Sequence, residues 1–123
     1  MTAEILPSES LLSVYNFSGR LKETDVNFHV LKLHDSFMLW IGTEPAKMDD
    51  LSMAMPTRFD SMPLGTQVLG ESTDLTSTSL AQKLAKKTGK QVFVSFNMAA
   101  DSELVLRVEE RVMEEMMMNP DKF

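Results

Sequence analysis

Residues 74–96, DLTSTSLAQKLAKKTGKQVFVSF, decide the fold, because they hold a complete helix followed at once by a strand. The apolar residues of the helix recur at three- and four-residue spacing, which places them on one side, and they are Leu80, Ala81, Leu84 and Ala85. Gly89 is a residue type that commonly ends helices, and an apolar strand is expected directly after it at 90–97. The segment predicts a fold that mixes helices with a sheet.

The start of this helix has two alternative signals. Ser79 and Gln82 have the spacing of a capping box, in which each side chain bonds the backbone of the other residue. Asp74 and Thr76 would begin the helix earlier, since both residue types are favoured N-caps. The sequence leaves both starts open.

The rest of the chain shows the two-residue alternation of strands and one further helical pattern. In chain order, strands are expected at 11–18, 25–33, 36–42, 51–55, 67–69 and 90–97, and a second helix at 102–118. His34 and Asp35 form a tight turn that makes the second and third strands a hairpin. The predicted class is α+β, a six-stranded mainly antiparallel sheet with two main helices. It forms a single domain at 11–123, after a flexible lead at 1–10.

The composition excludes several classes of function. A net charge of −6 argues against nucleic acid, whose affinity for proteins depends on lysine and arginine, and against an anionic membrane surface. The 123 residues include no cysteine, so we expect no disulfide and no thiolate site. The start of the chain lacks a signal-peptide pattern, and no apolar run is long enough to span a membrane. We therefore expect a protein of the cytoplasm, with the nucleus as an alternative location.

The sequence contains no pattern of residues typical of catalysis or metal binding. The two histidines, His29 and His34, have no carboxylate at metal-ligand spacing. No general acid–base pair is assigned to a common cleft. We expect a protein without enzyme activity, cofactor or metal.

The strands carry apolar residues on both faces, although only two helices are available to cover them. A solvated face should alternate apolar with polar residues. If both helices lie on one face, the other stays apolar and exposed, with His29, Leu31, Met38, Trp40 and Phe93 on it. Exposed apolar patches of this kind mark interfaces. The alternative is that loops or one helix cover the second face within the chain.

The second helix has two apolar stripes. The first contains Leu104, Val105, Val108, Val112 and Met116, and the second contains Leu106, Met113 and Met117. One stripe is enough to pack a helix on its own sheet. The second stripe either binds a partner or belongs to one wide buried stripe. The acidic residues of this region are predicted to lie on the helix surface, and they are Asp101, Glu103, Glu109, Glu110, Glu114 and Glu115.

Two charged segments are further candidates for contact with a partner. Arg58, Phe59 and Asp60 form either a salt-bridged turn or a recognition loop. Four lysines make a basic patch on an acidic protein, and they are Lys83, Lys86, Lys87 and Lys90. This patch is either a solvated surface or a contact for an acidic partner.

Taken together, these residues resemble the proteasome assembly chaperone 4 family. The motifs that carry the resemblance include Asn16-Phe17-Ser18, Phe28-His29-Val30, Leu39-Trp40, Arg58-Phe59-Asp60-Ser61-Met62-Pro63 and Lys90-Gln91-Val92-Phe93-Val94-Ser95. No single motif is a catalytic signature. Their joint order and spacing, from Val14 to the end of the chain, make the resemblance specific.

The resemblance implies a non-enzymatic chaperone with two kinds of partner. Such a protein forms a heterodimer with assembly chaperone 3 and promotes formation of the alpha ring of the 20S proteasome through the alpha-5 subunit. It is released before the particle matures. The chain could form a homodimer when its partner is absent. The alternative function is a small dimerising adaptor or scaffold in trafficking or signalling.

We expect the partner contacts to come from the apolar and charged surfaces described above. The sheet face with Leu31, Met38, Trp40 and Phe93 is the candidate dimer seam. The loop with Arg58 and Asp60, or the lysines Lys83, Lys86 and Lys87, is the candidate contact for the proteasome subunit. Met113 and Met117 of the second helix are candidates for a further partner contact.

Overall fold

The computed structural model describes residues 13–43, 47–58, 60–70, 74–99 and 101–123. Its elements are β1 (Ser13–Leu21), β2 (Thr24–Leu33), β3 (Ser36–Gly42), β4 (Leu51–Met55), β5 (Leu64–Leu69), α1 (Thr76–Thr88), β6 (Gln91–Asn97), α2 (Ser102–Met118) and a short 3-10 helix, η2 (Pro120–Lys122). The expected lead at 1–10 lies outside the described residues, as do the first two residues of the expected first strand.

The strands form one six-stranded sheet in the order β1-β2-β3-β6-β4-β5. Every neighbouring pair is antiparallel except β3 and β6, which run parallel. The predicted mainly antiparallel sheet is therefore confirmed. The β2–β3 hairpin closes through His34 and Asp35 as predicted, with Asp35 at φ 59°.

The first strand is longer than the sequence predicts. It does not end at Ser18, because the next residue, Gly19, still pairs with Val26 of β2. The strand ends at Leu21, and the two-residue turn Lys22-Glu23 has φ values of 49° and 63°. Two positive φ values define the hairpin turn that fits the twist of the flanking strands. The turn has no glycine or asparagine to signal it in the sequence.

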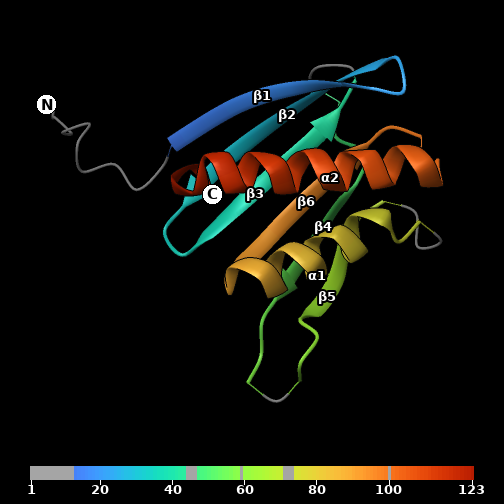
Figure 1. Ribbon diagram of the computed structural model, residues 1–123. Helices are drawn as coiled ribbons and strands as arrows, with labels where there is room; N and C mark the ends of the chain where they lie inside the picture. The colour runs from blue at the N-terminus through green and yellow to red at the C-terminus, as the bar shows by residue number, and fades with distance from the viewer. Residues whose placement is uncertain (1–12, 44–46, 59, 71–73, 100) are drawn as a thin grey trace, which may run out of the picture.

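Both helices lie on the same face of the sheet (Figure 1). α1 packs on β4, β5 and β6, and α2 crosses the other strands with contacts to β1. Between helices and sheet lies a core of fully buried side chains, which include Val26, Phe28, Val30, Phe37, Leu39, Ile41, Leu80, Leu84, Val92, Val94, Val108 and Val112. The covered face therefore consists of alternate residues of the central strands, as the alternation predicts.

The earlier of the two helix starts is the one observed for α1. The Asp74 carboxylate accepts a hydrogen bond from the Thr76 backbone N–H at 3.1 Å. The Ser79–Gln82 capping box is wrong, because the Gln82 amide donates instead to the backbone carbonyl of Pro63 at 2.9 Å. Gly89 ends the helix in the left-handed conformation at φ 70°, as expected.

The second helix has the predicted bounds, but Glu115 was wrongly predicted to lie on its surface. Its side chain is buried and accepts hydrogen bonds from the Tyr15 hydroxyl of β1 and from Asn119 at 2.8 Å. It also forms an ion pair with Arg111 at 2.9 Å. Arg111 in turn lies over the ring of Phe17 at 4.9 Å. This cluster attaches α2 to the edge strand β1.

The surroundings of Glu115 control its ionisation. Burial alone would raise the pKa of Glu115, but hydrogen bonds from Tyr15 and Arg111, the charge of Arg111 and the Asn119 bond together lower the pKa below 4.5. The bond to Glu115 raises the pKa of Tyr15 above 10.0. The charged form of Glu115 is therefore the form that stabilises the fold.

We predict that Glu115→Gln lowers the free energy of unfolding by about 2 kcal/mol at neutral pH, because the variant weakens charge-assisted hydrogen bonds. Because the pKa of Glu115 is lower in the folded protein, its charged form contributes its full stability above the unfolded value of 4.5. That stability is lost as the pH falls through the folded-state pKa. The difference between the two proteins should therefore shrink below pH 4.5. Urea denaturation at several pH values measures it.

Glu114→Gln is the matched control, because Glu114 is exposed and lies 3.6 Å from Arg111. A long ion pair with an exposed carboxylate contributes about 0.5 kcal/mol or less. Equal losses in the two variants, or a difference that grows as the pH falls, would contradict the assigned role of Glu115.

Candidate interaction surfaces

The face of the sheet opposite both helices, here called the open face, carries a row of apolar side chains across five strands. The strand register pairs the members of the row directly with one another, in the order Val14, Leu31, Met38, Phe93 and Met53. Thr66 of β5 pairs with Met53 and ends the row. Among the described residues no helix covers this face (Figure 1). Leu31, Met38 and Phe93, predicted to lie together, are therefore brought side by side.

The apolar surface of the open face is wider than the sequence predicts. Met55 and Leu64 pair with each other two residues along from Met53, and their side chains are 41% and 63% exposed. Val14, at the other end of the row, is 69% exposed. These residues were missed because alternation shows which residues share a face within one strand. It does not show which strands are neighbours.

Trp40 also points toward the open face, but the prediction that it is exposed there is wrong. Only 8% of the residue is accessible. Its indole N–H donates to the backbone carbonyl of Lys47 at 2.8 Å, and its ring lies 5.1 Å from the ring of His29. On its other side the ring covers Gly42, where an added Cβ would stand 2.6 Å from it. Trp40 therefore fastens the chain after β3 to the sheet.

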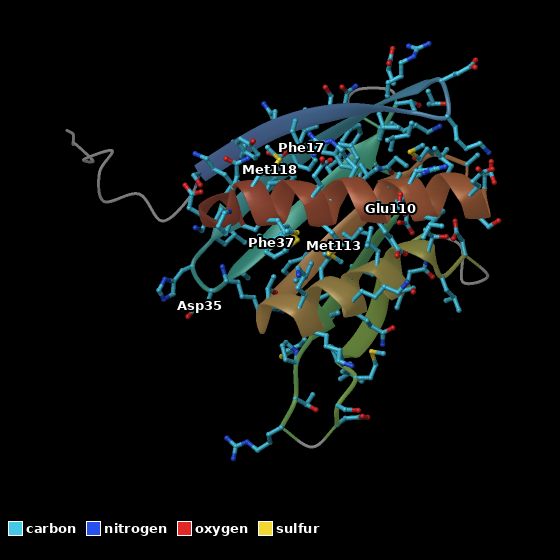
Figure 2. All side chains as sticks on the ribbon, viewed as in Figure 1. Phe17, Asp35, Phe37, Glu110, Met113 and Met118 are labelled. Atoms are coloured by element: carbon cyan, nitrogen blue, oxygen red, sulfur yellow. The ribbon has the colours of Figure 1, made fainter. Side chains whose placement is uncertain are left out.

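A second apolar surface lies on α2. The first predicted stripe is largely buried in the core, whereas the second faces away from it, with Leu106 54% and Met117 77% exposed. Met113 is half-buried and lies between α2 and α1 (Figure 2). We call Leu106, Met113, Met117 and Met118 the α2 ridge. They line a shallow groove together with Glu109, Glu110 and Glu114.

The structure divides the predicted lysine patch into two pairs. Lys83 bonds Glu109 of α2 at 3.1 Å, and Lys90 donates to the backbone carbonyl of Phe123 at 2.7 Å. Lys86 and Lys87 are exposed in the last turn of α1, with no ion pair to any described residue. Of the three predicted lysines, Lys83 joins α1 to α2 through Glu109, and the other two face solvent.

The loop between β4 and β5 extends beyond the end of the sheet (Figure 1). Arg58 and Asp60 are both exposed on it, and Asp60 accepts a hydrogen bond from the Met62 backbone N–H at 3.2 Å. The salt-bridged turn is wrong, since no ion pair joins Arg58 to Asp60 in the described part of the loop. Phe59 lies outside the described residues. Arg58 is thus presented as an exposed cation at one end of the molecule.

Two further features bear on the kind of site present. Within the described ranges, no group of three or more His, Cys, Asp or Glu residues is placed to hold a metal ion. No helix in the described part of the chain is long and apolar enough to cross a membrane.

Comparison with known proteins gives matches of three kinds: a family, curated relatives and solved structures. Residues 25–98 match the family described as Proteasome assembly chaperone 4. The chain is similar to the human and mouse proteins named Proteasome assembly chaperone 4, with 51% and 50% identity over 113 residues and 91% coverage of both chains in each case. Its fold is similar to that of a chain in the "Crystal Structure of a Novel Chaperone Complex for Yeast 20S Proteasome Assembly". The TM-score is 0.62 at 11% identity, with 92% of this chain and 97% of that chain covered.

We predict that Gly42→Ala displaces the indole of Trp40, because the new methyl group has no room beside the ring. The free energy of unfolding should fall by about 1–3 kcal/mol, the usual cost of overpacking. Trp40 is the single tryptophan, so its emission reports the change directly. We expect a red shift and stronger acrylamide quenching.

Gly19→Ala is the control for this measurement, since a Cβ there meets the flexible side chain of Arg111 at 3.3 Å. Its emission spectrum should match that of the unaltered protein. Unchanged quenching in Gly42→Ala would show that the Trp40 ring is not packed closely against Gly42.

Proposed function

The chain belongs to the proteasome assembly chaperone 4 family, and we propose on this basis that it is a non-catalytic chaperone of 20S proteasome assembly. It forms a heterodimer with assembly chaperone 3, contacts an alpha-5 type subunit while the alpha ring forms, and leaves before the particle matures. It acts in the cytoplasm, and also in the nucleus if proteasomes are assembled in that compartment. The names of the human and mouse relatives support the chaperone role.

The open face is the observation that carries the proposal of a heterodimer. Its apolar row from Val14 to Met53 contains no charged residue, and the row spans most of the width of the sheet. Stable interfaces bury about 800 Å² per partner, which the face of a sheet of this size supplies. Two sheets pack face to face at about 10 Å, with side chains interdigitating. A partner with an open sheet of its own would complete a four-layer assembly, with the helices outside.

Charge favours a different partner chain over a second copy. Two copies of this chain would each carry a net charge of −6, so they would repel one another over distances within a Debye length. A less acidic partner chaperone avoids this repulsion and packs on the same row. When that partner is absent, the chain forms a homodimer that is weaker at low salt.

The contact with the proteasome subunit is assigned to the exposed cations. Arg58 extends at the end of the β4–β5 loop, and Lys86 and Lys87 lie at the end of α1. These positions leave the open face free for the partner chaperone. An interface built mainly from such charges is polar and modest in affinity. A modest affinity suits a chaperone that has to leave the assembled ring.

We predict that Met38→Glu weakens the heterodimer by at least about a hundredfold, because it buries a carboxylate in the middle of the apolar row. The mass of the purified mixture with assembly chaperone 3, measured by light scattering after gel filtration, should fall from that of a 1:1 complex to that of separate chains. Met62→Glu, on the exposed β4–β5 loop, is the matched control.

A complex that survives Met38→Glu as well as it survives Met62→Glu would remove the open face from the dimer seam. Recovery of coat or signalling proteins with the purified chain, in place of alpha-ring subunits, would overturn the chaperone function and favour the adaptor.

We predict that Arg58→Glu combined with Lys86→Glu and Lys87→Glu leaves the heterodimer intact but weakens its binding to an isolated alpha-5 type subunit by about tenfold or more. Reversed charges repel the acidic surface that these cations are proposed to meet. Surface plasmon resonance at two salt concentrations measures the effect, which should shrink at high salt. Equal affinity of the two proteins at low salt would show that these cations do not meet the subunit.

A further inference from the structure

Most of the α2 ridge takes no part in the packing of α2 within the chain, since Leu106, Met117 and Met118 are exposed and only Met113 contacts the core. The opposite side of the helix already buries Leu104, Val108, Val112 and Met116. Leu106, Met113 and Met117 are spaced seven and four residues apart, so they follow one line along the helix for about 16 Å. This line is exposed at Leu106 and Met117 and half-buried at Met113. An apolar line of this kind, outside the main buried stripe, presents a surface for another molecule.

The groove beside the ridge is acidic as well as apolar. Its charged lining consists of Glu109, Glu110 and Glu114, and none of the described lysines or arginines lines it. Glu110 pairs with exposed Arg107 and Glu114 with half-buried Arg111, each at 3.6 Å, and both carboxylates are themselves exposed. Ion pairs of that length and exposure contribute little, so both carboxylates remain able to bind an incoming cation. Figure 2 shows Glu110 on α2, at a position opposite the buried stripe.

The shape of the surface selects a helical partner. Backbone groups within a helix are already bonded, so α2 offers an extended peptide no strand-like pairing. A partner helix satisfies its own backbone and has only to bury an apolar stripe. Methionines adapt to such stripes because their side chains are unbranched and flexible.

We propose that the α2 ridge binds an amphipathic helix of about three turns, whose apolar stripe is flanked by lysine or arginine. The apolar residues of that helix pack on Leu106, Met113 and Met117, and its cations bond Glu110 and Glu114. The site lies on the helix side of the molecule and the open face on the other, so both can be occupied at once. The inference does not depend on the proposed function.

A synthetic helical peptide tests this site directly. The probe is a 14-residue peptide with leucine at helical spacing and lysine on both flanks, and its control carries glutamate in place of every lysine. The protein is the full chain with ¹³C-labelled methionine methyl groups. We expect the basic peptide to shift the signals of Met113, Met117 and Met118 while leaving Met38 and Met53 unchanged. Its affinity should exceed that of the acidic peptide by about tenfold or more.

Two variants separate the apolar and the charged parts of the site. Leu106→Glu with Met117→Glu should abolish the shifts, and Glu110→Gln with Glu114→Gln should lower the affinity of the basic peptide by about tenfold while leaving that of the acidic peptide within a few-fold. All four residues are exposed, so circular dichroism should show unchanged folding. Met62→Glu, far along the chain, is the control.

Three outcomes would overturn the proposal. The first is equal affinity for the two peptides, and the second is a set of shifts confined to Met38 and Met53. The third is a concentration-dependent dimer that Met117→Glu dissociates, because the ridge would then be a contact between two copies of this chain. None of these results depends on whether assembly chaperone 3 binds the open face.

Discussion

The parallel pairing of β3 with β6 is the contact on which the rest of the structure depends. β6 bonds β3 on one side and β4 on the other, so it joins the β1-β2-β3 meander to the β4–β5 pair. A parallel connection has to cross over one face of the sheet, and α1, which leads directly into β6, lies on that face. α2 leaves β6 and returns over the same face, towards β1. One face is covered twice and the other is left open, which is why the molecule has two unlike surfaces.

The parts of the fold that depend on local spacing could be predicted from the sequence. The bounds of α2 agree with the prediction because each end is set by residues next to it: Asp101 caps the start, and Pro120 follows the last residue by two positions. The helix stop at Gly89 is likewise a property of one residue. The apolar character of both sheet faces also followed from alternation within single strands, and it indicated an interface before the strand order was known.

The parts that depend on distant partners could not be predicted. Glu115 is buried because Tyr15, one hundred residues away in the chain, bonds it, and nothing near Glu115 signals this. Gln82 has the spacing of a cap, yet its amide meets Pro63 on a different element. Trp40 is covered by a loop of its own chain, so a correct prediction of its face gave a wrong prediction of its exposure. The central residues of the open face could be predicted from the sequence, whereas the residues at its two ends could not.

The bond between Tyr15 and Glu115 has a consequence for how copies of this protein meet. β1 is an edge strand with a single neighbour, and such strands are the ones that proteins exchange in domain-swapped assemblies. If β1 left its place, Glu115 would lose the hydroxyl that bonds it, and the stacking of Phe17 on Phe28 would be lost as well. In a swapped pair the β1 of a second chain would restore both contacts, so their loss falls on the opened intermediate. The cluster around Glu115 therefore slows the exchange of edge strands between copies rather than forbidding it.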